Sequence, residues 1–392
     1  MPEPSLGLIM IVRDEASNLG KSLTPVASCF DEVIAVDTGS TDNTADICQE
    51  LGAKVFDFTW QDDFAAARNF SIAKATADWL FWLDADNAIT PKMVADLRRK
   101  LPEAPAVLWA LEQLEPKGGQ LWQKRCFPRC PEAYFVGRVH EQLAHPADWP
   151  SVATAVRVRH WGYADHSHSQ AKGRYYLTLL NQMLEENPAD FYARFQLGRT
   201  HYNLREFNDS VEQLTQVVQD EHARMANPQI WAHAHFILAQ AYERLAKFNE
   251  AEHILEQLIE SQPSNGLGYF HYGRLAYGRQ DWQAAAEHFA QTLMLGVDQP
   301  FVDLDPAQTL FLAEYYLGRS YERLDRLAEA RAALERAAMK QPHNPAPRTD
   351  LARLLLAQGQ AGQARVHLKQ ILNVSPTDRA AKRLWAQTEA LP

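Results

Sequence analysis

The chain has 392 residues, of which 46% are hydrophobic and 22% charged, so it is long enough for two or three globular domains and too apolar for a disordered protein. Its formal net charge of −10 argues against nucleic-acid binding, which needs a concentrated basic surface. No apolar run approaches the ~20 residues that cross a bilayer, and the opening MPEPSLGLIMIVRDE lacks the features of a secretory signal. We therefore expect a cytoplasmic protein without a transmembrane segment.

Four apolar runs in the first part of the chain alternate with amphipathic stretches, as in parallel strands joined by helices. They are LGLIMIV (6–12), EVIAV (32–36), AKVFDF (53–58) and WLFWL (79–83). Their continuous apolar character predicts that both faces of the sheet are covered. One helix is expected through ADICQEL, capped by Ser40 or Thr41 and ended by Gly52 in a left-handed turn, and another over 64–75.

The cysteines all lie in the first half of the chain, at Cys29, Cys48, Cys126 and Cys130. Cys126 and Cys130 have no second Cys/His pair nearby, which disfavours a structural zinc site. Reduced, mostly buried thiols are expected instead.

From about Tyr192 onward the strand pattern gives way to a repeat of about 34 residues. One unit carries Leu317, Gly318, Tyr321, Ala330, Leu334, Ala337 and Pro342 at the spacing of a tetratricopeptide repeat, and related sets begin at Leu197, Leu238, Tyr272 and Leu351. Small residues such as Gly318 and Ala330 let two antiparallel helices approach. Recurrent prolines and glycines disfavour a coiled coil.

The change of pattern predicts an α/β domain over residues 1–175 and about five helical repeats over 176–392. The stretch LGVDQPFVDLDPAQ is longer than a normal connector, so a loop or extra turn is expected there.

Acidic residues follow two of the expected strands, and ligands of open α/β sheets collect at the carboxyl ends of strands. Asp84 and Asp86 come directly after WLFWL and can hold a divalent cation against a diphosphate, although two solvated loop acids would give the same pattern. Asp37, in VDTGSTDNT, can accept from a base imide or a ribose hydroxyl, and Gly39 allows close backbone approach. A capped turn is the structural alternative, and both can hold together.

Five short segments follow one another between residues 5 and 175, namely MIVRDEASNL, VDTGSTDNT, DDFAAARNFSIAKATADWLFWLDADN, GRVHEQL and HWGY. In this order they resemble the motifs of family 2 glycosyltransferases and, more narrowly, of bacterial tetratricopeptide-containing members related to peptide S-glycosyltransferases. The resemblance implies a GT-A fold, a Rossmann-like α/β domain, followed by an all-α repeat superhelix. It also implies a nucleotide diphosphate sugar donor, with a uridine diphosphate hexose or N-acetylhexosamine expected, and inversion at the transferred sugar.

The same resemblance assigns donor-binding roles. The backbone at Ile11 and Val12 and the side chain of Asp37 would contact the nucleoside, with help from Arg68, for which a buried pair with Asp62 or Asp63 is the alternative. The family commonly has Asn where this chain has Asp14, whereas Glu15 keeps the acid that follows.

The metal assignment also follows from the resemblance: Asp84 and Asp86 would hold Mn²⁺ or Mg²⁺ against the diphosphate. His160, in HWGY, would be a third ligand or a core histidine. Further along, Lys172 and Arg174 could close over the diphosphate or remain exposed helix cations. The histidines at 166 and 168 are expected to be loop residues.

An inverting transfer needs a carboxylate that takes the proton of the acceptor. Glu141, in GRVHEQL, is the candidate, with Asp63 and Glu112 as competitors. His140 would orient the acceptor or pack beside the carboxylate.

The acceptor is expected to be a protein, a peptide or an envelope glycan docked by the repeats, and exposed repeat ends would allow a homodimer. Two other classes compete. One is an interaction scaffold whose α/β domain binds nucleotide without turnover. The other is a nucleotidyltransferase, which should carry a glycine-rich basic loop near the first strand, and MIVRDEASNL supplies none.

Overall fold

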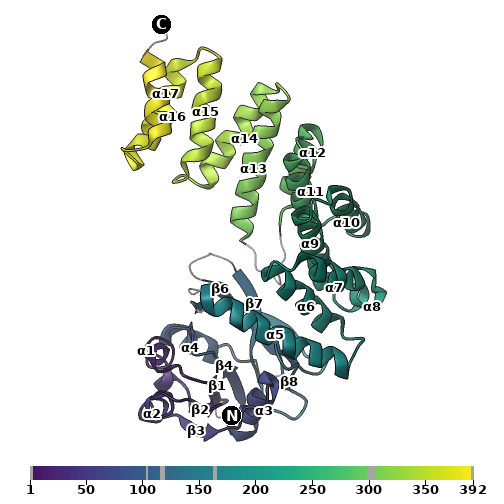
Figure 1. Cartoon of the computed structure of the whole chain (residues 1–392). Coiled ribbons are helices and arrows are strands. Elements are labelled where there is room, and N and C mark those ends of the chain that lie inside the picture. Colours follow the sequence, from purple (N-terminus) through teal and green to yellow (C-terminus); the bar gives the residue numbers. More distant parts are fainter. Residues whose placement is uncertain (1–2, 103–104, 115–119, 162–165, 298–304, 390–392) are drawn as a thin grey trace. The chain divides into compact units, whose positions relative to one another are not determined.

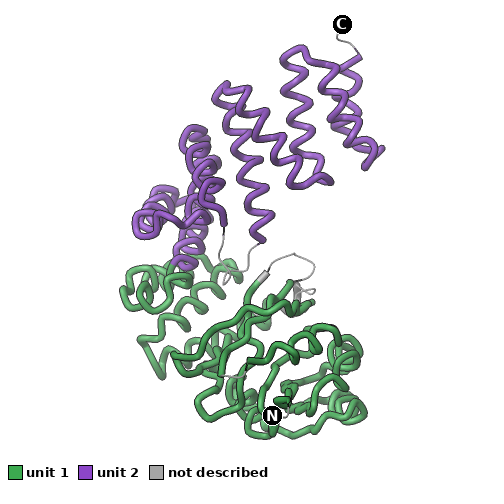
Figure 2. Tube along the Cα trace, turned by 180° about the vertical axis from the view of Figure 1, so that it is seen from behind, with its two compact units in different colours: residues 1–231, 300–304 green, residues 232–299, 305–392 purple. Residues whose placement is uncertain are grey.

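The computed structural model describes residues 3–102, 105–114, 120–161, 166–297 and 305–389 (Figure 1). These residues fall into two compact units, one reaching to Trp231 and the other beginning at Ala232 (Figure 2). The first unit holds all the described strands and the first helices, and the described part of the second is helical.

An eight-stranded sheet with the order β3-β2-β1-β4-β7-β6-β10-β5 forms the centre of the first unit. The four apolar runs form parallel neighbours, as predicted, with bounds β1 (Leu6–Val12), β2 (Glu32–Asp37), β3 (Lys54–Asp57) and β4 (Trp79–Trp82). The sheet has further strands that the apolar pattern did not predict, namely β5 (Asn87–Ala88), β6 (Val107–Leu114), β7 (Gln120–Pro128) and β10 (Ser151–His160). They make the sheet mixed, because β7 pairs antiparallel with both β4 and β6.

Both faces of the sheet are covered at β1, β2 and β4, which confirms the prediction for these three apolar runs. β3 is covered only in part, because Val55 and Phe56 are half-buried and the two end residues are exposed. Leu8 and Met10 of β1 point into a cluster with α1 (Ala16–Ser22), α2 (Thr44–Glu50) and α4 (Pro91–Arg98). Ile9 points to the other face, where it packs with α3 (Phe64–Lys74) and a hairpin of β8 (Tyr134–Val136) and β9 (Gln142–Ala144). Because successive side chains of a strand point to opposite faces, β1 contributes to the apolar layers on both sides of the sheet.

The predicted cap of α2 is wrong, and the reason lies at the neighbouring strand ends. Asn43 is the N-cap residue and makes no side-chain cap bond. The hydroxyl of Ser40 donates to Asp37 instead, and that of Thr41 donates to Asp14. The other end is as predicted, because Gly52 follows α2 with a φ of 84°.

The first helices after the sheet belong to the same compact unit. They are α5 (His166–Glu186), α6 (Phe191–Asn203), α7 (Phe207–Gln219) and α8 (Glu221–Ala226). Val139, just before β9, packs in one buried cluster with Leu180 of α5 and Ala193 of α6. This cluster fixes α5 and α6 against the segment that joins the two strands of the hairpin.

Antiparallel helix pairs follow along the rest of the chain. Their members are α9 (Pro228–Arg244), α10 (Phe248–Ser261), α11 (Gly266–Gly278), α12 (Trp282–Leu295), α13 (Pro306–Arg323), α14 (Leu327–Lys340), α15 (Pro345–Ala357), α16 (Ala361–Val374) and the final α17 (Arg379–Glu389). The predicted close approach at small residues is confirmed, because a Cβ on Gly318 would lie 2.8 Å from Cγ of Leu334. The expected insertion falls largely on residues 298–304, outside the described residues.

Among the described residues, no helix is both long and apolar enough to cross a membrane. All four cysteines are free thiols, with Cys48 and Cys126 buried and the other two half-buried. Burial raises the pKa of Cys48 to about 11, so it is an unreactive thiol at neutral pH.

Candidate functional site

The strand-end acids meet at one edge of the sheet because the strands that carry them are parallel. Val12 and Asp37 are register partners at the ends of β1 and β2. Asp84 follows β4, the other parallel neighbour of β1. Val12, Asp37 and Asp84 are thus brought to the carboxyl ends of adjacent strands, where open α/β sheets bind ligands.

Asp37 caps the turn that follows β2. Its Oδ1 accepts from the backbone N–H groups of Gly39 at 3.1 Å and Ser40 at 2.8 Å, and from the Ser40 hydroxyl at 2.8 Å. Gly39 has a φ of 104°, a conformation that favours glycine. These bonds use one carboxylate oxygen, so the capped turn and a ligand contact through Oδ2 are compatible.

The loop after β1 is tied to the loop after β2 by Asp14. Its carboxylate accepts from the backbone and the hydroxyl of Thr41, and these bonds lower the pKa of Asp14. Glu15 lies beside it and is half-buried. Burial raises the pKa of Glu15, and the charges of Asp86 and Asp84 raise it further. Glu15, Asp84 and Asp86 thus form one group of neighbouring acids, the acidic group.

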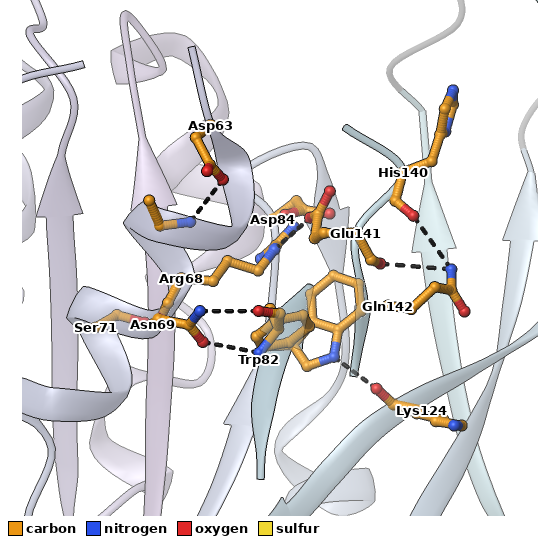
Figure 3. A network of polar contacts seen from close by, with 12 residues as sticks. Asp63, Arg68, Asn69, Ser71, Trp82, Asp84, Lys124, His140, Glu141 and Gln142 are labelled. Carbon is orange, nitrogen blue, oxygen red and sulfur yellow. Dashed lines mark hydrogen bonds and ion pairs between the residues drawn. The ribbon is translucent and has the colours of Figure 1, made fainter. Parts of the chain in front are cut away.

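Arg68 of α3 is the centre of the site (Figure 3). Its Nη2 donates to Oδ1 of Asp84 at 2.8 Å, and its Nε donates to Oε1 of Glu141 at 2.5 Å. The guanidinium lies 4.3 Å from the ring centre of Trp82. Burial alone would lower the pKa of Arg68, but the two carboxylates outweigh it and raise that pKa. Arg68 therefore joins a strand-end acid to the candidate base.

The alternative partners expected for Arg68 are engaged elsewhere. Asp63 is the N-cap residue of α3 and accepts from the backbone N–H of Ala66 at 2.8 Å. Asp62 accepts from Trp60 at 2.9 Å and from Tyr175 at 2.5 Å. The pairing of Arg68 with Asp62 or Asp63 is thus not observed.

Asp84 is held as a carboxylate. Burial would raise its pKa, but the charges of Arg68 and Arg125 and the bond from Asn87 lower it to about 2. The Arg125 guanidinium lies 3.9 Å from Oδ2 of Asp84. Asp84 is therefore charged at any physiological pH, and much of that charge is neutralised by arginine.

Asp86 has the opposite electrostatic environment. Burial raises its pKa and the charge of Asp84 raises it further, while His160 and Lys172 oppose the shift. Nδ1 of His160 lies 3.5 Å from Oδ1 of Asp86 and 3.0 Å from Oδ1 of Asn87. A cation placed against Asp86 would relieve the repulsion between the two aspartates.

The residues present fit a divalent cation at Asp86, since carboxylate oxygen is the ligand that Mg²⁺ and Mn²⁺ prefer. Asp84, Asp86 and His160 do not form a tight three-ligand set. Within the described ranges, the only such set is His201, Glu206 and Asp209 on α6 and α7, and Glu206 there already pairs with His201 and Arg174. A cation at Asp86 would thus take most of its ligands from a bound diphosphate or water.

A buried pair that sequence reasoning missed lies behind Asp84. Arg125 of β7 exposes 1% of its surface, and its Nη2 donates to Oε2 of Glu112 at 2.5 Å. Its guanidinium lies 3.6 Å from the ring centre of Trp82, so Trp82 contacts two arginines. Glu112, considered as a competing base, is buried in this pair. The sequence around Arg125 carries no motif that marks it.

Glu141 and His140 occupy the segment before β9. The Glu141 side chain retains 13% exposure, and one of its oxygens is held by Arg68. The His140 ring makes an edge contact with Tyr176, with ring centres 5.3 Å apart, and points away from Arg68 in Figure 3. Burial lowers the pKa of His140 to about 3, and the charges of Arg199 and Lys172 add to this. His140 is therefore neutral at pH 7.

The two cations predicted on α5 have different surroundings. Lys172 is exposed, and its charge acts on Glu15 and Asp86. Arg174 pairs instead with Glu206, so it is not brought to the acidic group. The expectation of loop residues at 166 and 168 is wrong, because both positions lie in the first turn of α5. Their side chains lie outside the described residues.

The described strands and helices define a Rossmann-like α/β domain that is followed along the chain by helical repeats. Residues 8–160 match the model of Glycosyl transferase family 2, and residues 236–294 and 323–388 match Tetratricopeptide repeat models. The chain is therefore a family 2 glycosyltransferase domain followed by tetratricopeptide repeats.

Curated relatives agree with this assignment. The chain is 35% identical over 207 residues to a TPR repeat-containing protein of Synechococcus elongatus, covering 49% of this chain and 51% of that protein. It is 27% identical over 228 residues to the SPbeta prophage-derived glycosyltransferase SunS of Bacillus subtilis, covering 55% and 54%. An uncharacterized glycosyltransferase of Rickettsia felis is 31% identical over 88 residues, covering 22% and 31%. The matched regions span about half the length of the first two relatives.

Proposed function

We propose that this protein transfers a hexose or N-acetylhexosamine from a uridine diphosphate sugar to a protein, peptide or glycan acceptor, with inversion at the anomeric carbon. The observation that carries the proposal is the position of Arg68. It bonds a strand-end acid of the donor edge, Asp84, and the candidate base, Glu141, through one buried guanidinium. The carboxylate on the donor side and the base that deprotonates the acceptor would thus be held at a fixed distance from each other.

The donor would lie along the ends of β1 and β2. The backbone at Ile11 and Val12 would contact the nucleoside, as would Oδ2 of Asp37, which makes no hydrogen bond within the described residues. Gly39 would leave room for it. The charge of Lys172, which acts on Asp86, would help to hold the diphosphate.

Mn²⁺ or Mg²⁺, held by Asp86 with Asp84 behind it, would neutralise the negative charge that grows on the leaving diphosphate. The arginines that pair with Asp84 keep that carboxylate ionised and fixed in position. His160 would orient Asp86 through the side of its ring that also contacts Asn87.

Glu141 would act as the base. The acceptor atom forms a bond to the anomeric carbon from the face opposite the diphosphate, the carbon–oxygen bond to the diphosphate breaks, and the acceptor proton passes to Glu141. Arg68 holds Oε1 of Glu141, so the proton would go to Oε2. Asp63 and Glu112 are poorer candidates because the first caps α3 and the second pairs with Arg125.

A thermal-shift screen with UDP-, GDP- and dTDP-sugars, with and without Mn²⁺, tests the donor class, because a ligand of the native state raises the melting temperature. Hydrolysis of the stabilising sugar nucleotide is then measured for wild type and Asp86→Ala. We expect a metal-dependent shift from UDP-sugars and slow hydrolysis that Asp86→Ala abolishes. Equal rates for the two proteins would remove the metal role. Binding without hydrolysis or transfer would favour the nucleotide-binding scaffold.

A further inference from the structure

Helices α5 and α6 hold the segment that carries the candidate base. Arg138 donates to Glu186 of α5 at 2.5 Å, and Gln142 donates through Nε2 to the hydroxyl of Tyr192 on α6 at 2.8 Å. Between these two residues lies Glu141, which bonds Arg68. α6 therefore contacts the residue next to the candidate base, and α5 contacts a residue three positions before it.

A polar row on α6 faces this segment. Tyr192, Gln196 and Arg199 are four and three residues apart, the spacing of one helix face, and we call them the α6 row. The Tyr192 hydroxyl accepts from the side-chain amides of both Gln142 and Gln196, each at 2.8 Å. Gln142, Tyr192 and Gln196 thus form a connected set of hydrogen-bonding groups beside Glu141.

Gln196 is not satisfied by these contacts. It exposes 4% of its surface, and its buried Oε1 has no hydrogen-bond partner among the described residues. Turning the amide over would let Oε1 accept from Tyr192, but the NH₂ group would then lose its partner. One polar atom of this buried glutamine therefore lacks a hydrogen-bond partner among the described residues in either orientation.

Arg199 supplies a charge at the end of the row. It is half-buried, and within the described part of the chain it makes no ion pair. Burial sets the low pKa of His140, and the charge of Arg199 lowers it further, which places that charge beside the segment of Glu141. The neighbouring Arg194, by contrast, is bonded to Gln213 and to the backbone of Pro188. The α6 row therefore ends in an uncompensated guanidinium.

We propose that the α6 row binds the acceptor as a peptide, with a main-chain amide bonded to Gln196 and a carboxylate of the peptide paired with Arg199. This inference rests on the proposed function. A guanidinium binds a carboxylate through two parallel hydrogen bonds, and a glutamine amide matches a peptide amide in both donor and acceptor. The preferred acceptor is thus an acidic peptide whose modified residue lies close to an Asp or Glu.

The donor diphosphate is the competing anion, and the structure favours Lys172 for that role. The charges that act on Asp86 include Lys172, Asp84, His160 and Glu112. Lys172 also acts on His140, whereas Arg199 acts on His140 and Tyr192, on the side of Glu141 that α6 covers.

Short synthetic peptides test the proposal, each with Ser, Thr and Cys as potential acceptors, flanked by Asp and Glu, by Gln, or by Lys. Transfer from the sugar nucleotide that the full chain hydrolyses is followed by mass spectrometry. The variants are Arg199→Gln and Arg199→Glu, and the control is Arg205→Gln, an exposed arginine just after α6. We expect wild type and the control to prefer acidic peptides by about tenfold or more in kcat/KM, the discrimination of one charge-assisted contact. Arg199→Gln loses that preference and Arg199→Glu prefers the Lys-flanked peptides.

Hydrolysis of the donor without peptide separates the two proposals. If it is absent from wild type, the proposed function fails and this inference falls with it. If hydrolysis is normal in wild type but weakened by Arg199→Gln, Arg199 binds the donor and the inference is overturned. Equal preference among the peptides, or transfer only to an acidic oligosaccharide offered in parallel, also overturns it. Unchanged hydrolysis with inverted peptide preference in Arg199→Glu supports it.

Discussion

Replacing Arg68 with methionine should destabilise the first unit by an amount that depends on pH. The pKa of Asp84 is about 2 instead of its ordinary 3.8, so its folded-state environment stabilises the protein by about 2 kcal/mol at neutral pH. Because the folded pKa is depressed, this stability is present above about pH 4 and is lost as the pH falls toward 2. Arg68 provides the largest of the opposing charges.

Arg68→Met also leaves Glu141 without its partner, and removing one member of a buried ion pair costs about 3–5 kcal/mol. We expect a loss of about 3 kcal/mol at pH 7, since Arg125 and Asn87 remain beside Asp84. For a unit of this size the melting temperature should fall by about 6–12 °C. At pH 5 the deficit should be smaller, because the pKa of Asp84 rises in the variant and protonation removes the unpaired charge.

Melting followed by tryptophan fluorescence at pH 7 and pH 5 measures both effects. Arg98→Met is the matched control in the same unit, because Arg98 pairs with Asp31, whose side chain is 47% exposed. Such a pair contributes at most about 1 kcal/mol. Equal losses for the two variants, or a loss for Arg68→Met that is the same at both pH values, would refute the reasoning.

Three further predictions concern single residues. Asp86→Asn should raise the melting temperature of the ligand-free protein, because the fold disfavours the charge of Asp86. It should also abolish the Mn²⁺-dependent rise in melting temperature that a UDP-sugar causes. A lower melting temperature of the ligand-free variant would contradict the unfavourable charge. Glu141→Gln should reduce kcat of transfer by about 10²–10⁴-fold with donor binding intact. Asp63→Asn keeps a side chain that can cap α3 and should leave kcat unchanged. Similar losses of kcat in the two variants would reject Glu141 as the base. Gly318→Val should destabilise the second unit by about 1–3 kcal/mol in urea unfolding, because the added side chain would clash with Leu334. Gly278→Ala has open space around the added carbon and should be neutral or stabilising. An unchanged free energy of unfolding for Gly318→Val would show that α13 and α14 can separate.

The parallel half of the sheet was predictable because three of its strands, β1, β2 and β4, are buried on both faces. A continuous apolar run such as that of β1 has few alternatives, and its bounds agree with the structure. Strands β6, β7 and β10 were not predicted. Polar residues such as Glu112 and Arg125 interrupt their apolar pattern, and these residues are buried only because they pair with each other across the sheet.

The site was predictable where it depends on strand ends and was missed where it depends on distant contacts. The placement of Asp37 and Asp84 follows from the parallel register. The bond between Arg68 and Glu141 joins residues 73 positions apart, and no local pattern contains it. The contribution of α6 was missed for the same reason, since Tyr192 reads in the sequence as an ordinary residue of a helical repeat.

The cluster of Val139, Leu180 and Ala193 has a consequence for making chimaeras of this protein. A graft that replaced everything after the last strand would strip the apolar cover from the loop that carries Glu141 and would remove Tyr192 with it. A junction placed after Asn227, between α8 and α9, would carry α5 to α8 along with the sheet. Exchange of solenoids between relatives should therefore succeed at the second junction and fail at the first, whatever the incoming repeats bind.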